Sequence, residues 1–443
     1  MVNDMIYKLY DLYSKNNPDS IAFKTYETDV TYGELISKID IFTKKYKNLF
    51  YDKKIRILFL EHPSIDLSIA YLSLVNVGAV CFFLHPNIEE VDKYVEKYEI
   101  DIVISEKPTK TSITLNELLN SSFKFSIKTK RIEVYDACTA FFTSGTSGEP
   151  KCVLLSEKNF CTNVISGYKK IEYLQNDIHL CLLPFYHAYG ITCSLLGPLY
   201  SGGLICFGKS IGTILSDINI FKPTFIQTVP MILRSLLAYQ SSNPISIKKI
   251  LSGGAYTPVE LIDEFRKRGI AVYSCYGMTE CSPCISCNDN KKDKDASVGK
   301  LLNCNDIMFV DDEIFLKGTN VMIGYFGEEK IKDWFPTGDC GYIDNDGYLY
   351  LTGRKNGCIK LANGEKIYPE EIEKIANKYP NVVESRLRYI NQNILLEVFA
   401  LEKLQVDDIK LFVETELNHS IVIEKVIQVV NELPKTTTMK IRR

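Results

Sequence analysis

The chain has 443 residues, 46% of them hydrophobic, and a formal net charge of -3 at pH 7. This length exceeds the roughly 250–300 residues that one hydrophobic core supports, so we expect at least two domains. The basic residues are dispersed along the sequence and the net charge is slightly acidic. Both properties argue against a nucleic-acid partner or an anionic membrane and favour small-molecule chemistry.

The first residues mix charged and apolar side chains at helical spacing, which predicts an amphipathic helix over Met1–Asn17 rather than a signal peptide. We therefore expect a cytoplasmic protein. Two stretches, Leu67–Leu84 and Ile178–Gly208, contain no Asp, Glu, Lys or Arg. Because glycine, proline or asparagine residues interrupt both, they are interpreted as buried helix-and-strand pairs rather than membrane spans.

Fourteen cysteines in a chain without an export signal indicate reduced thiols that act mostly as small buried hydrophobes. Cys281, Cys284 and Cys287 have a spacing that could hold iron–sulfur or zinc, with Cys275 or Cys304 as a fourth ligand. There is no further closely spaced Cys-Pro or His pair, so packing is favoured and no metal cluster is predicted.

Short apolar runs alternate with helical stretches between residues 55 and 276. Such repetition predicts an α/β fold, with a large N-terminal domain of doubly wound parallel sheets covered by helices on both faces. We expect helices at 65–77 and 258–268. The expected strands are 55–60, 79–84, 102–105, 180–183, 204–207, 224–228, 250–252 and 271–273.

After residue 277 the pattern changes to short strands separated by turns, including strands at 313–316 and 348–352, which predicts a small antiparallel subdomain. Beyond residue 353, a small α+β domain is expected. We therefore predict an N-terminal domain over 1–353 and a small mobile C-terminal domain over 354–443, joined by a polar link. The elements expected in the C-terminal domain are helices at 368–378 and 406–417 and strands at 394–400 and 426–430.

One segment, Phe142–Lys151, reads Phe-Thr-Ser-Gly-Thr-Ser-Gly-Glu-Pro-Lys. Glycines let backbone N–H groups approach an anion, hydroxyls add donors and lysine supplies a compact positive charge, so the segment suits a phosphate chain. A Walker P-loop is disfavoured, because Lys151 stands between Pro150 and Cys152. A plain turn between two strands is the alternative. The phosphate-binding candidates are Thr143, Ser144, Gly145, Thr146 and Lys151.

Further segments of this kind follow along the chain: Ser252–Ala255, Tyr276–Glu280, Thr337–Asp339, Gly353–Arg354, and Pro434–Thr436 leading to Lys440. In this order and spacing, and with Thr31–Leu35 and Gly78–Ala79 before them, they resemble the adenylate-forming superfamily. That superfamily includes acyl-CoA synthetases, peptide-synthetase adenylation domains and luciferases. Each motif alone is weak, but together they are specific, and the resemblance covers essentially the whole chain.

The resemblance implies a ligase that activates a carboxylic acid with ATP, forms an acyl-adenylate and pyrophosphate, and then makes a thioester. Attack by a carboxylate on the α-phosphate joins two anions, so positive charge and hydrogen-bond donors must surround the reacting phosphorus. By resemblance, Lys151 and its loop hold the β- and γ-phosphates, Thr279 donates to the α-phosphate, and Glu280 holds Mg²⁺.

The resemblance also assigns the rest of the nucleotide. Tyr276, in the same motif as Gly277, stacks on adenine. Asp339 accepts both ribose hydroxyls and Arg354 lies near ribose and phosphate, whereas an Asx turn is the alternative role for Asp339. The residues expected on the other side of adenine are Gly253, Gly254 and Ala255.

Lys440 matches the family lysine that bridges the substrate carboxylate and the α-phosphate in the first half-reaction. In the second half-reaction the small domain rotates, and Asn356 stands where the family usually has Asp or Lys at the hinge. Gly357 beside it permits large backbone changes. Cys152 and Met439 each replace a glycine of the family, so side chains are expected where the backbone could otherwise approach the phosphates freely. These departures motivate the alternative of a non-catalytic member that binds a nucleotide or a carrier protein.

The sequence narrows the class of acid substrate and leaves two candidates for the thiol acceptor. Adenylation domains for amino acids usually place an Asp within the segment that here reads Leu183–Gly190, and this segment contains no carboxylate. The resemblance to the acyl- and aryl-acid branch favours an amine-free acid, with His187 lining or gating its pocket or, alternatively, a buried core histidine.

No carrier domain is expected after Arg443, so CoA and the phosphopantetheine of a free-standing carrier protein are both possible thiols. A phosphotransferase that uses the loop before Lys151 is a further alternative, and it would release ADP rather than AMP.

Overall fold

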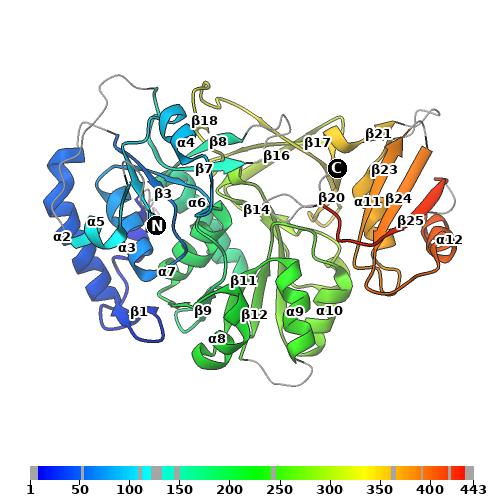
Figure 1. Ribbon diagram of the computed structural model, residues 1–443, viewed down its shortest axis with the longest axis horizontal. Helices are drawn as coiled ribbons and strands as arrows, with labels where there is room; N and C mark the ends of the chain where they lie inside the picture. Colours follow the sequence, from blue (N-terminus) through cyan, green and yellow to red (C-terminus); the bar gives the residue numbers. More distant parts are fainter. Residues whose placement is uncertain are drawn as a thin grey trace. The chain divides into compact units, whose positions relative to one another are not determined.

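The computed structural model separates the chain into two units, and each is described by itself (Figure 1). Unit 1 contains Met1–Asp306 and Leu316–Phe335, and unit 2 contains Ile307–Phe315 and Pro336–Arg443. The structure describes residues 8–50, 54–107, 112–120, 132–143, 150–240, 246–360, 366–390, 393–417 and 421–434.

The larger sheet of unit 1 has nine strands in the order β15-β14-β13-β12-β11-β9-β10-β1-β2. Its six central strands, from β13 to β1, run parallel, and the strands at both edges are antiparallel. The predicted parallel sheet is therefore confirmed. The strands are β1 (Ile21–Lys24), β2 (Asp29–Thr31), β9 (Ile178–Cys181), β10 (Leu204–Phe207), β11 (Phe225–Thr228), β12 (Lys249–Ser252), β13 (Ala271–Gly277), β14 (Cys284–Cys287) and β15 (Lys300–Leu301).

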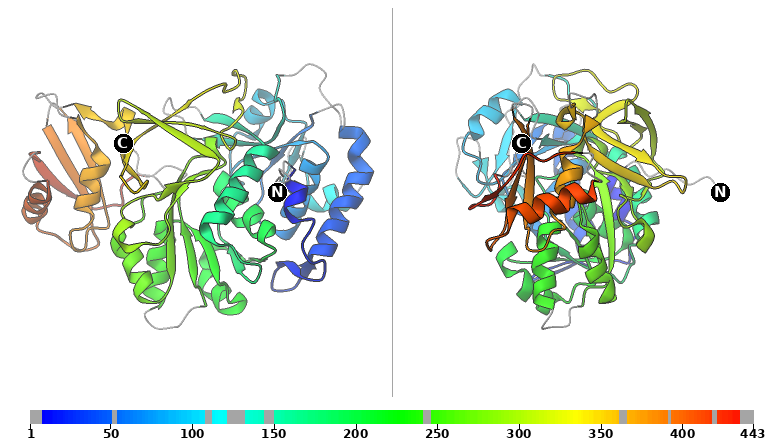
Figure 2. Two further views of the ribbon diagram at one scale, coloured as in Figure 1. Left: turned by 180° about the vertical axis from the view of Figure 1, so that it is seen from behind. Right: turned by 90° about the vertical axis from the view of Figure 1, so that its right-hand side faces the viewer.

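Helices α8 (Ile214–Phe221), α9 (Pro230–Gln240) and α10 (Val259–Lys267) lie beside this sheet (Figure 2). Leu233 of α9 and Phe265 of α10 are fully buried in one core with sheet residues such as Ile226 of β11 and Ile250 of β12. Basic residues in the last turn of α10 stabilise the helix, because their positive charges lie at the negative end of its dipole.

The second sheet of unit 1 has the order β18-β8-β7-β4-β3-β5-β6; β8 pairs antiparallel with both of its neighbours, β7 and β18, and the other neighbouring strands pair parallel. Helix α3 (Ile65–Asn76) is capped at its N-terminus by Ser64, whose hydroxyl accepts a hydrogen bond from Leu67 N at 3.1 Å. The strands of this second sheet are β3 (Arg56–Phe59), β4 (Val80–Phe83), β5 (Ile102–Ile104), β6 (Ser112–Ile113), β7 (Ala137–Thr143), β8 (Lys151–Ser156) and β18 (Gly324–Tyr325).

The stretch Leu67–Leu84 is thus a buried helix followed by a strand, as predicted. Within the described ranges, no helix is both long and apolar enough to cross a membrane. The described part of the predicted N-terminal helix is α1 (Leu9–Tyr13). The other helical elements of unit 1 are α2 (Tyr32–Phe50), α4 (Val91–Lys97), α5 (Leu115–Asn120), α6 (Glu157–Ile171), α7 (Gly197–Ser201), the π-helix η1 (Gly190–Leu196), and the 3-10 turns η2 (Ile211–Thr213), η3 (Thr279–Cys281) and η4 (Lys292–Lys294).

The antiparallel subdomain predicted after residue 277 is a four-stranded sheet in the order β16-β17-β19-β20. Asp344 shapes the turn before β20, because its carboxylate accepts hydrogen bonds from the N–H groups of Asp346 and Tyr348. Gly347 follows with a φ of +85°, which only glycine adopts without strain. The strands are β16 (Asn305–Val310), β17 (Glu313–Gly318), β19 (Phe335–Ile343) and β20 (Leu349–Arg354).

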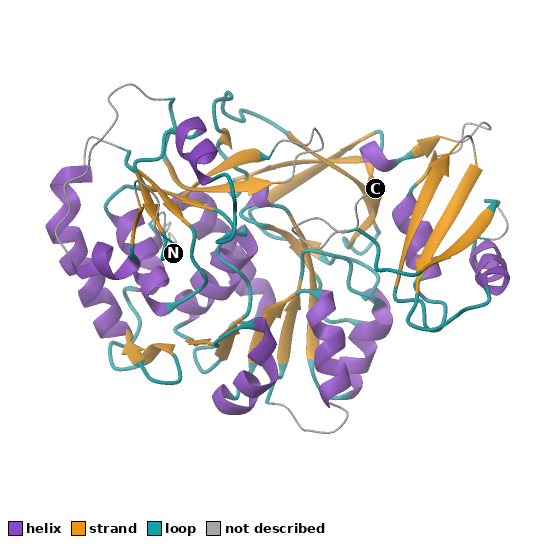
Figure 3. Cartoon of the chain, viewed as in Figure 1, coloured by secondary structure: helices purple, strands orange, loops and turns teal. Residues whose placement is uncertain are grey.

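The C-terminal part of unit 2 is the predicted α+β fold (Figure 3). In its three-stranded sheet, β24 pairs antiparallel with β23 and parallel with β25. Ile409 and Val413 of α12 and Leu396 and Val398 of β24 are completely buried in one core. The elements are η5 (Lys355–Gly357), β21 (Ile359–Lys360), β22 (Lys366–Ile367), α11 (Pro369–Ala376), β23 (Glu384–Ile390), β24 (Asn393–Phe399), α12 (Val406–Glu416) and β25 (Lys425–Val429).

By its contacts, unit 2 includes parts of the antiparallel sheet as well as the C-terminal α+β fold. Its sequence therefore starts before the boundary expected at residue 354. The contacts define which residues form a compact unit and do not define which residues move together. The division into an N-terminal domain over 1–353 and a mobile domain over 354–443 stays a prediction.

Candidate active site

The two motifs expected around adenine leave the same edge of the larger sheet. Strand β12 ends at Ser252 and strand β13 continues to Gly277, and Ser252 pairs with Ser274 in parallel register. The carboxyl ends of parallel strands are where open α/β sheets bind ligands. The structure thus brings Gly253, Gly254 and Ala255 to the edge at which Tyr276 and its motif emerge.

Glycine is required at these positions for different physical reasons. Gly254 has a φ of +79°, so it meets the backbone requirement of a tight turn. A Cβ on Gly277 would lie 2.2 Å from the carbonyl oxygen of Pro283, and one on Gly253 would lie 3.2 Å from the ring of Tyr189. Close packing within the protein is therefore sufficient to require glycine at residue 277, whatever a nucleotide adds.

Glu280 lies on the turn η3 and is 8% exposed. Two buried asparagines clamp the backbone that follows it. The side-chain amides of Asn163 and Asn320 both donate to the carbonyls of Cys281 and Cys284, at 2.7–3.1 Å. We did not predict a role for either asparagine from the sequence. A sequence signal did exist for Asn163, which stands on the buried face of helix α6 among apolar side chains.

The carboxylate of Glu280 is contacted by a second residue that the motifs did not indicate. The hydroxyl of Tyr325 donates to Glu280 Oε1 at 3.0 Å. Burial, followed by the nearby Glu280 carboxylate, raises the pKa of the Tyr325 phenol well above its usual range. The Lys151 ammonium lies 4.6 Å from the centroid of the same ring. A single tyrosine therefore contacts both the lysine expected to bind phosphate and the glutamate expected to hold magnesium.

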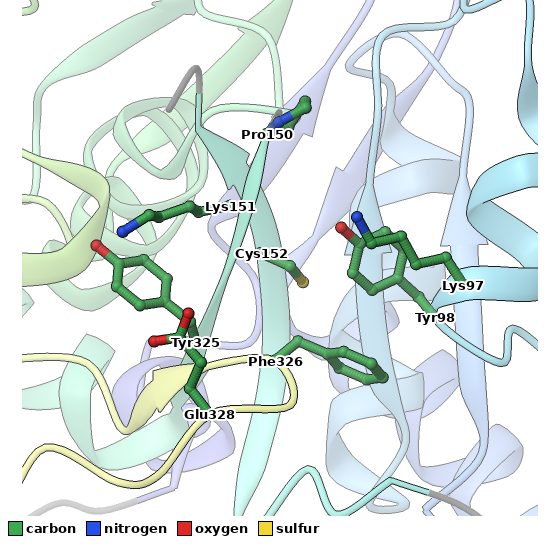
Figure 4. A pocket seen from close by; sticks show the side chains of 8 residues that line it. All are labelled: Lys97, Tyr98, Pro150, Lys151, Cys152, Tyr325, Phe326 and Glu328. Atoms are coloured by element: carbon green, nitrogen blue, oxygen red, sulfur yellow. The ribbon is translucent and has the colours of Figure 1, made fainter. Parts of the chain in front are cut away.

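Lys151 is exposed and borders a cavity of about 260 Å³ (Figure 4). Lys97, at the end of helix α4, brings a second ammonium group to the same cavity. Two lysines against the single carboxylate of Glu328 give the lining a net positive charge, which suits an anion. The lining residues are Lys97, Tyr98, Pro150, Lys151, Cys152, Tyr325, Phe326 and Glu328.

The sequence suggested that the side chain of Cys152 stands where backbone approach to phosphate is usually free. In the structure Cys152 follows Lys151 on strand β8, so the two side chains point to opposite faces of the sheet. Cys152 is 3% exposed and packs in the core with Phe82 and Leu154. Burial raises its pKa. This replacement of glycine therefore extends the core.

The ends of the predicted phosphate loop lie on an antiparallel pair of strands, with Thr143 of β7 directly opposite Lys151 of β8. Both strands that the alternative of a plain turn requires are therefore present, and phosphate binding by the segment between them stays a prediction. Ser144, Gly145 and Thr146 lie outside the described residues, as does Lys440.

In unit 2, Asp339 and Arg354 face each other across strands β19 and β20. Arg354 Nε lies 2.6 Å from Asp339 Oδ1, and Asp339 is 7% exposed. Its backbone N–H donates to Thr337 Oγ1 at 3.1 Å, and that hydroxyl donates to the carbonyl of Ile314 at 2.8 Å. Glu313 accepts the N–H of Gly338 at 3.1 Å. The pair thus stands on a well-anchored turn.

His187 follows the carboxyl end of strand β9 and is half-buried. Its ring lies 4.7 Å from that of Tyr186, which in turn lies 5.0 Å from the ring of His85. The completely buried histidine of this sheet is His179, which is hydrogen-bonded to Gln227 at 3.0 Å. Among the described histidines, the role of a core histidine therefore suits His179 better than His187.

Comparisons with known proteins give a family and a fold. Residues 11–326 match the family model described as AMP-binding enzyme. Among curated proteins, the 2-succinylbenzoate–CoA ligase of Bacillus subtilis is 32% identical over 66% of this chain and 63% of that protein. The ligase of the same name from Bacillus cytotoxicus is 26% identical over 96% of this chain and 95% of that protein.

Solved structures share the fold over nearly the whole chain. The o-succinylbenzoate CoA synthetase of Bacillus subtilis, in complex with its acyl-adenylate intermediate, has a TM-score of 0.83 and 23% identity, covering 98% of this chain and 96% of that one. ATP-bound MatB from Rhodopseudomonas palustris has a TM-score of 0.83 and 22% identity, with the same coverage. The predicted α/β architecture is thereby confirmed.

Proposed function

The chain belongs to the AMP-binding enzyme family, and we propose that it uses the residues described above to activate an amine-free carboxylic acid and pass it to CoA. It is an ATP-dependent, AMP-forming acid–thiol ligase, as are its curated relatives named 2-succinylbenzoate–CoA ligases. Because these relatives are ligases, they support the catalytic interpretation over a non-catalytic binding protein.

The observation that carries the assignment of residues is the contact of Tyr325 with both Lys151 and Glu280. It brings an ammonium group and a carboxylate, from motifs far apart in the sequence, to one phenol. Phosphate oxygens need the ammonium, and a magnesium ion needs carboxylate oxygen. This arrangement supports a site for the phosphate end of a nucleotide in unit 1.

Glu280 suits magnesium on the chemistry of its donors. Its carboxylate is nearly buried, Tyr325 hydrogen-bonds one of its oxygens, and the second oxygen is a hard anionic ligand. When bound, Mg²⁺ neutralises charge on the phosphates. In the proposal, Lys151 binds the β- and γ-phosphates and Thr279 donates to the α-phosphate, so both residues orient the phosphorus for attack.

The proposal gives the remaining nucleotide contacts to Tyr276 and Gly277 with the Gly253–Ala255 segment, which bind adenine. Asp339 accepts hydrogen bonds from the ribose hydroxyls, and Arg354 orients that carboxylate. Lys440 bridges the attacking carboxylate and the α-phosphate, which lowers the repulsion between the two anions.

His187 is proposed to line the acid pocket. The relatives act on 2-succinylbenzoate, an aromatic acid without an amine, and the Leu183–Gly190 segment contains no carboxylate that would grip an amine. This acid is therefore the first to test. CoA is the proposed thiol, with a free-standing carrier protein as the alternative. The cytoplasmic location remains a prediction.

The test identifies the products that the protein forms from ATP and CoA with each acid of a panel. Chromatography should show AMP and an acyl-CoA for at least one acid, and ATP–pyrophosphate exchange should occur with that acid without CoA. ADP as the product would instead support a phosphotransferase. Nucleotide binding in calorimetry without turnover of any acid would contradict the proposal.

A further inference from the structure

We propose that Tyr325 is a positioning residue that holds Lys151 and Glu280 apart as separate charges, so that one meets phosphate and the other meets the magnesium ion. The inference rests on the proposed function of the site and adds a residue that none of the recognised motifs contains. Tyr325 itself need not touch the reacting atoms.

The contacts of Tyr325 divide between its hydroxyl and its ring. The hydroxyl donates to Glu280 Oε1 at 3.0 Å, which fixes the carboxylate and leaves Oε2 for another ligand. The face of the ring attracts the Lys151 ammonium, 4.6 Å from the centroid. Figure 4 shows the amine of Lys151 beside the phenol. A direct ion pair would neutralise the two charges that the proposed reaction needs, and the separate contacts of Tyr325 with each group compete with it.

The backbone fixes Tyr325 relative to both partners. Strand β18 pairs with β8, the strand of Lys151, with Tyr325 opposite Val153. On the other side, the N–H of Met322, shortly before Tyr325, donates to the carbonyl of Glu280 itself at 2.7 Å. One short segment therefore binds the lysine strand and the glutamate turn, so the phenol is placed between them by main-chain hydrogen bonds.

Two substitutions separate the parts of this role. Tyr325→Phe removes the hydroxyl and keeps the ring, whereas Tyr325→Leu removes both. The chain offers a matched control in Tyr26, whose ring carries the Lys209 ammonium at 4.9 Å and whose hydroxyl donates to Asp217. Tyr26→Phe breaks the same kind of lysine–tyrosine–carboxylate contact outside the proposed site.

ATP binding is measured by calorimetry at stepped free Mg²⁺ concentrations, and pyrophosphate exchange is measured over the same range. Tyr325→Phe should raise the Mg²⁺ concentration for half-maximal binding and exchange by about tenfold, the size of one lost hydrogen bond to a charged group. The KM for the acid should stay the same. Tyr325→Leu should also weaken ATP binding at saturating Mg²⁺, and Tyr26→Phe should match the wild type.

A folded Tyr325→Phe protein with the Mg²⁺ dependence of the wild type would overturn the inference. If that variant does not fold, the Mg²⁺ titration of Tyr325→Leu decides, and failure of both to fold would show a packing role instead. Wild-type protein that binds Mg²⁺ and ATP without exchanging pyrophosphate for any acid would contradict the proposed function alone, because the calorimetric titration would still test Tyr325.

Discussion

Replacing Asp339 with alanine tests the ribose contact that we assign to unit 2. The carboxylate is 7% exposed, and its position is fixed by Arg354 at 2.6 Å and by the anchored turn around Thr337. Each of the two ribose hydroxyls would make one hydrogen bond to this charged group, worth about 1.5–3 kcal/mol. Their joint loss corresponds to about 3–6 kcal/mol, or a fall in kcat/KM for ATP of about 10²–10⁴-fold.

The lost ion pair adds little to this effect, because the Arg354 side chain is 48% exposed and solvent screens it. The assay is pyrophosphate exchange with ATP, 2′-deoxyATP and 3′-deoxyATP. The wild type should prefer ATP over each deoxy analogue by at least about tenfold, as the loss of one such hydrogen bond requires. Asp339→Ala should lose this preference, because the partner of both hydroxyls is gone.

The exposed Asp346, on the turn before β20, provides a control that removes a carboxylate from the same antiparallel sheet. Asp346→Ala should keep the preference for ATP. If Asp339→Ala is folded and still discriminates against both deoxy analogues as the wild type does, Asp339 does not bind the ribose.

Three further outcomes are expected. Lys440→Ala should lower pyrophosphate exchange by about 100-fold or more, the size of a lost electrostatic contact to a transition state, whereas Arg442→Ala in the same tail should not, and equal effects would remove Lys440 from the reaction. Burial lowers the pKa of His179 to about 3, so the unfolded chain binds the extra proton below about pH 6.5 and stability should fall on acidification by up to about 1.4 kcal/mol per pH unit. Denaturant unfolding at pH 7 and 5 should show a shallower loss in His179→Gln, and identical losses would contradict this cause. Gly190→Ala would place a Cβ 2.2 Å from the carbonyl oxygen of Pro184 and should cost about 1–3 kcal/mol, whereas Gly212→Ala, with its nearest contact at 3.5 Å, should change the unfolding midpoint little.

Much of the fold could be predicted because its signals are local. The charge-free stretch Leu67–Leu84 has the length of one helix and one strand, and the structure has α3 and β4 there. The strand predicted at 204–207 has these same bounds as β10. Apolar periodicity and turn-forming residues are properties of neighbouring positions, so a sequence reading can recover them.

The motifs likewise predict which residues carry the chemistry, including Lys151, Glu280 and Asp339, and these roles stay predictions. The placement of the residues beside them could not be predicted in the same way. The sequence suggested that Cys152 would intrude on the phosphate loop, but strand alternation turns its side chain into the core. The reason for Gly277 also lies partly in the nearby carbonyl of Pro283, at a register shift between β13 and β14.

What the sequence alone determined was the order of helices and strands, the family resemblance and the chemical identity of the candidate groups, because each is written in short stretches of chain. Only the tertiary structure decided that Tyr325 joins Lys151 to Glu280 and that Asn163 and Asn320 clamp the turn behind them. Those contacts join segments far apart along the chain, and their geometry depends on how two sheets and a helix pack, which no local pattern encodes.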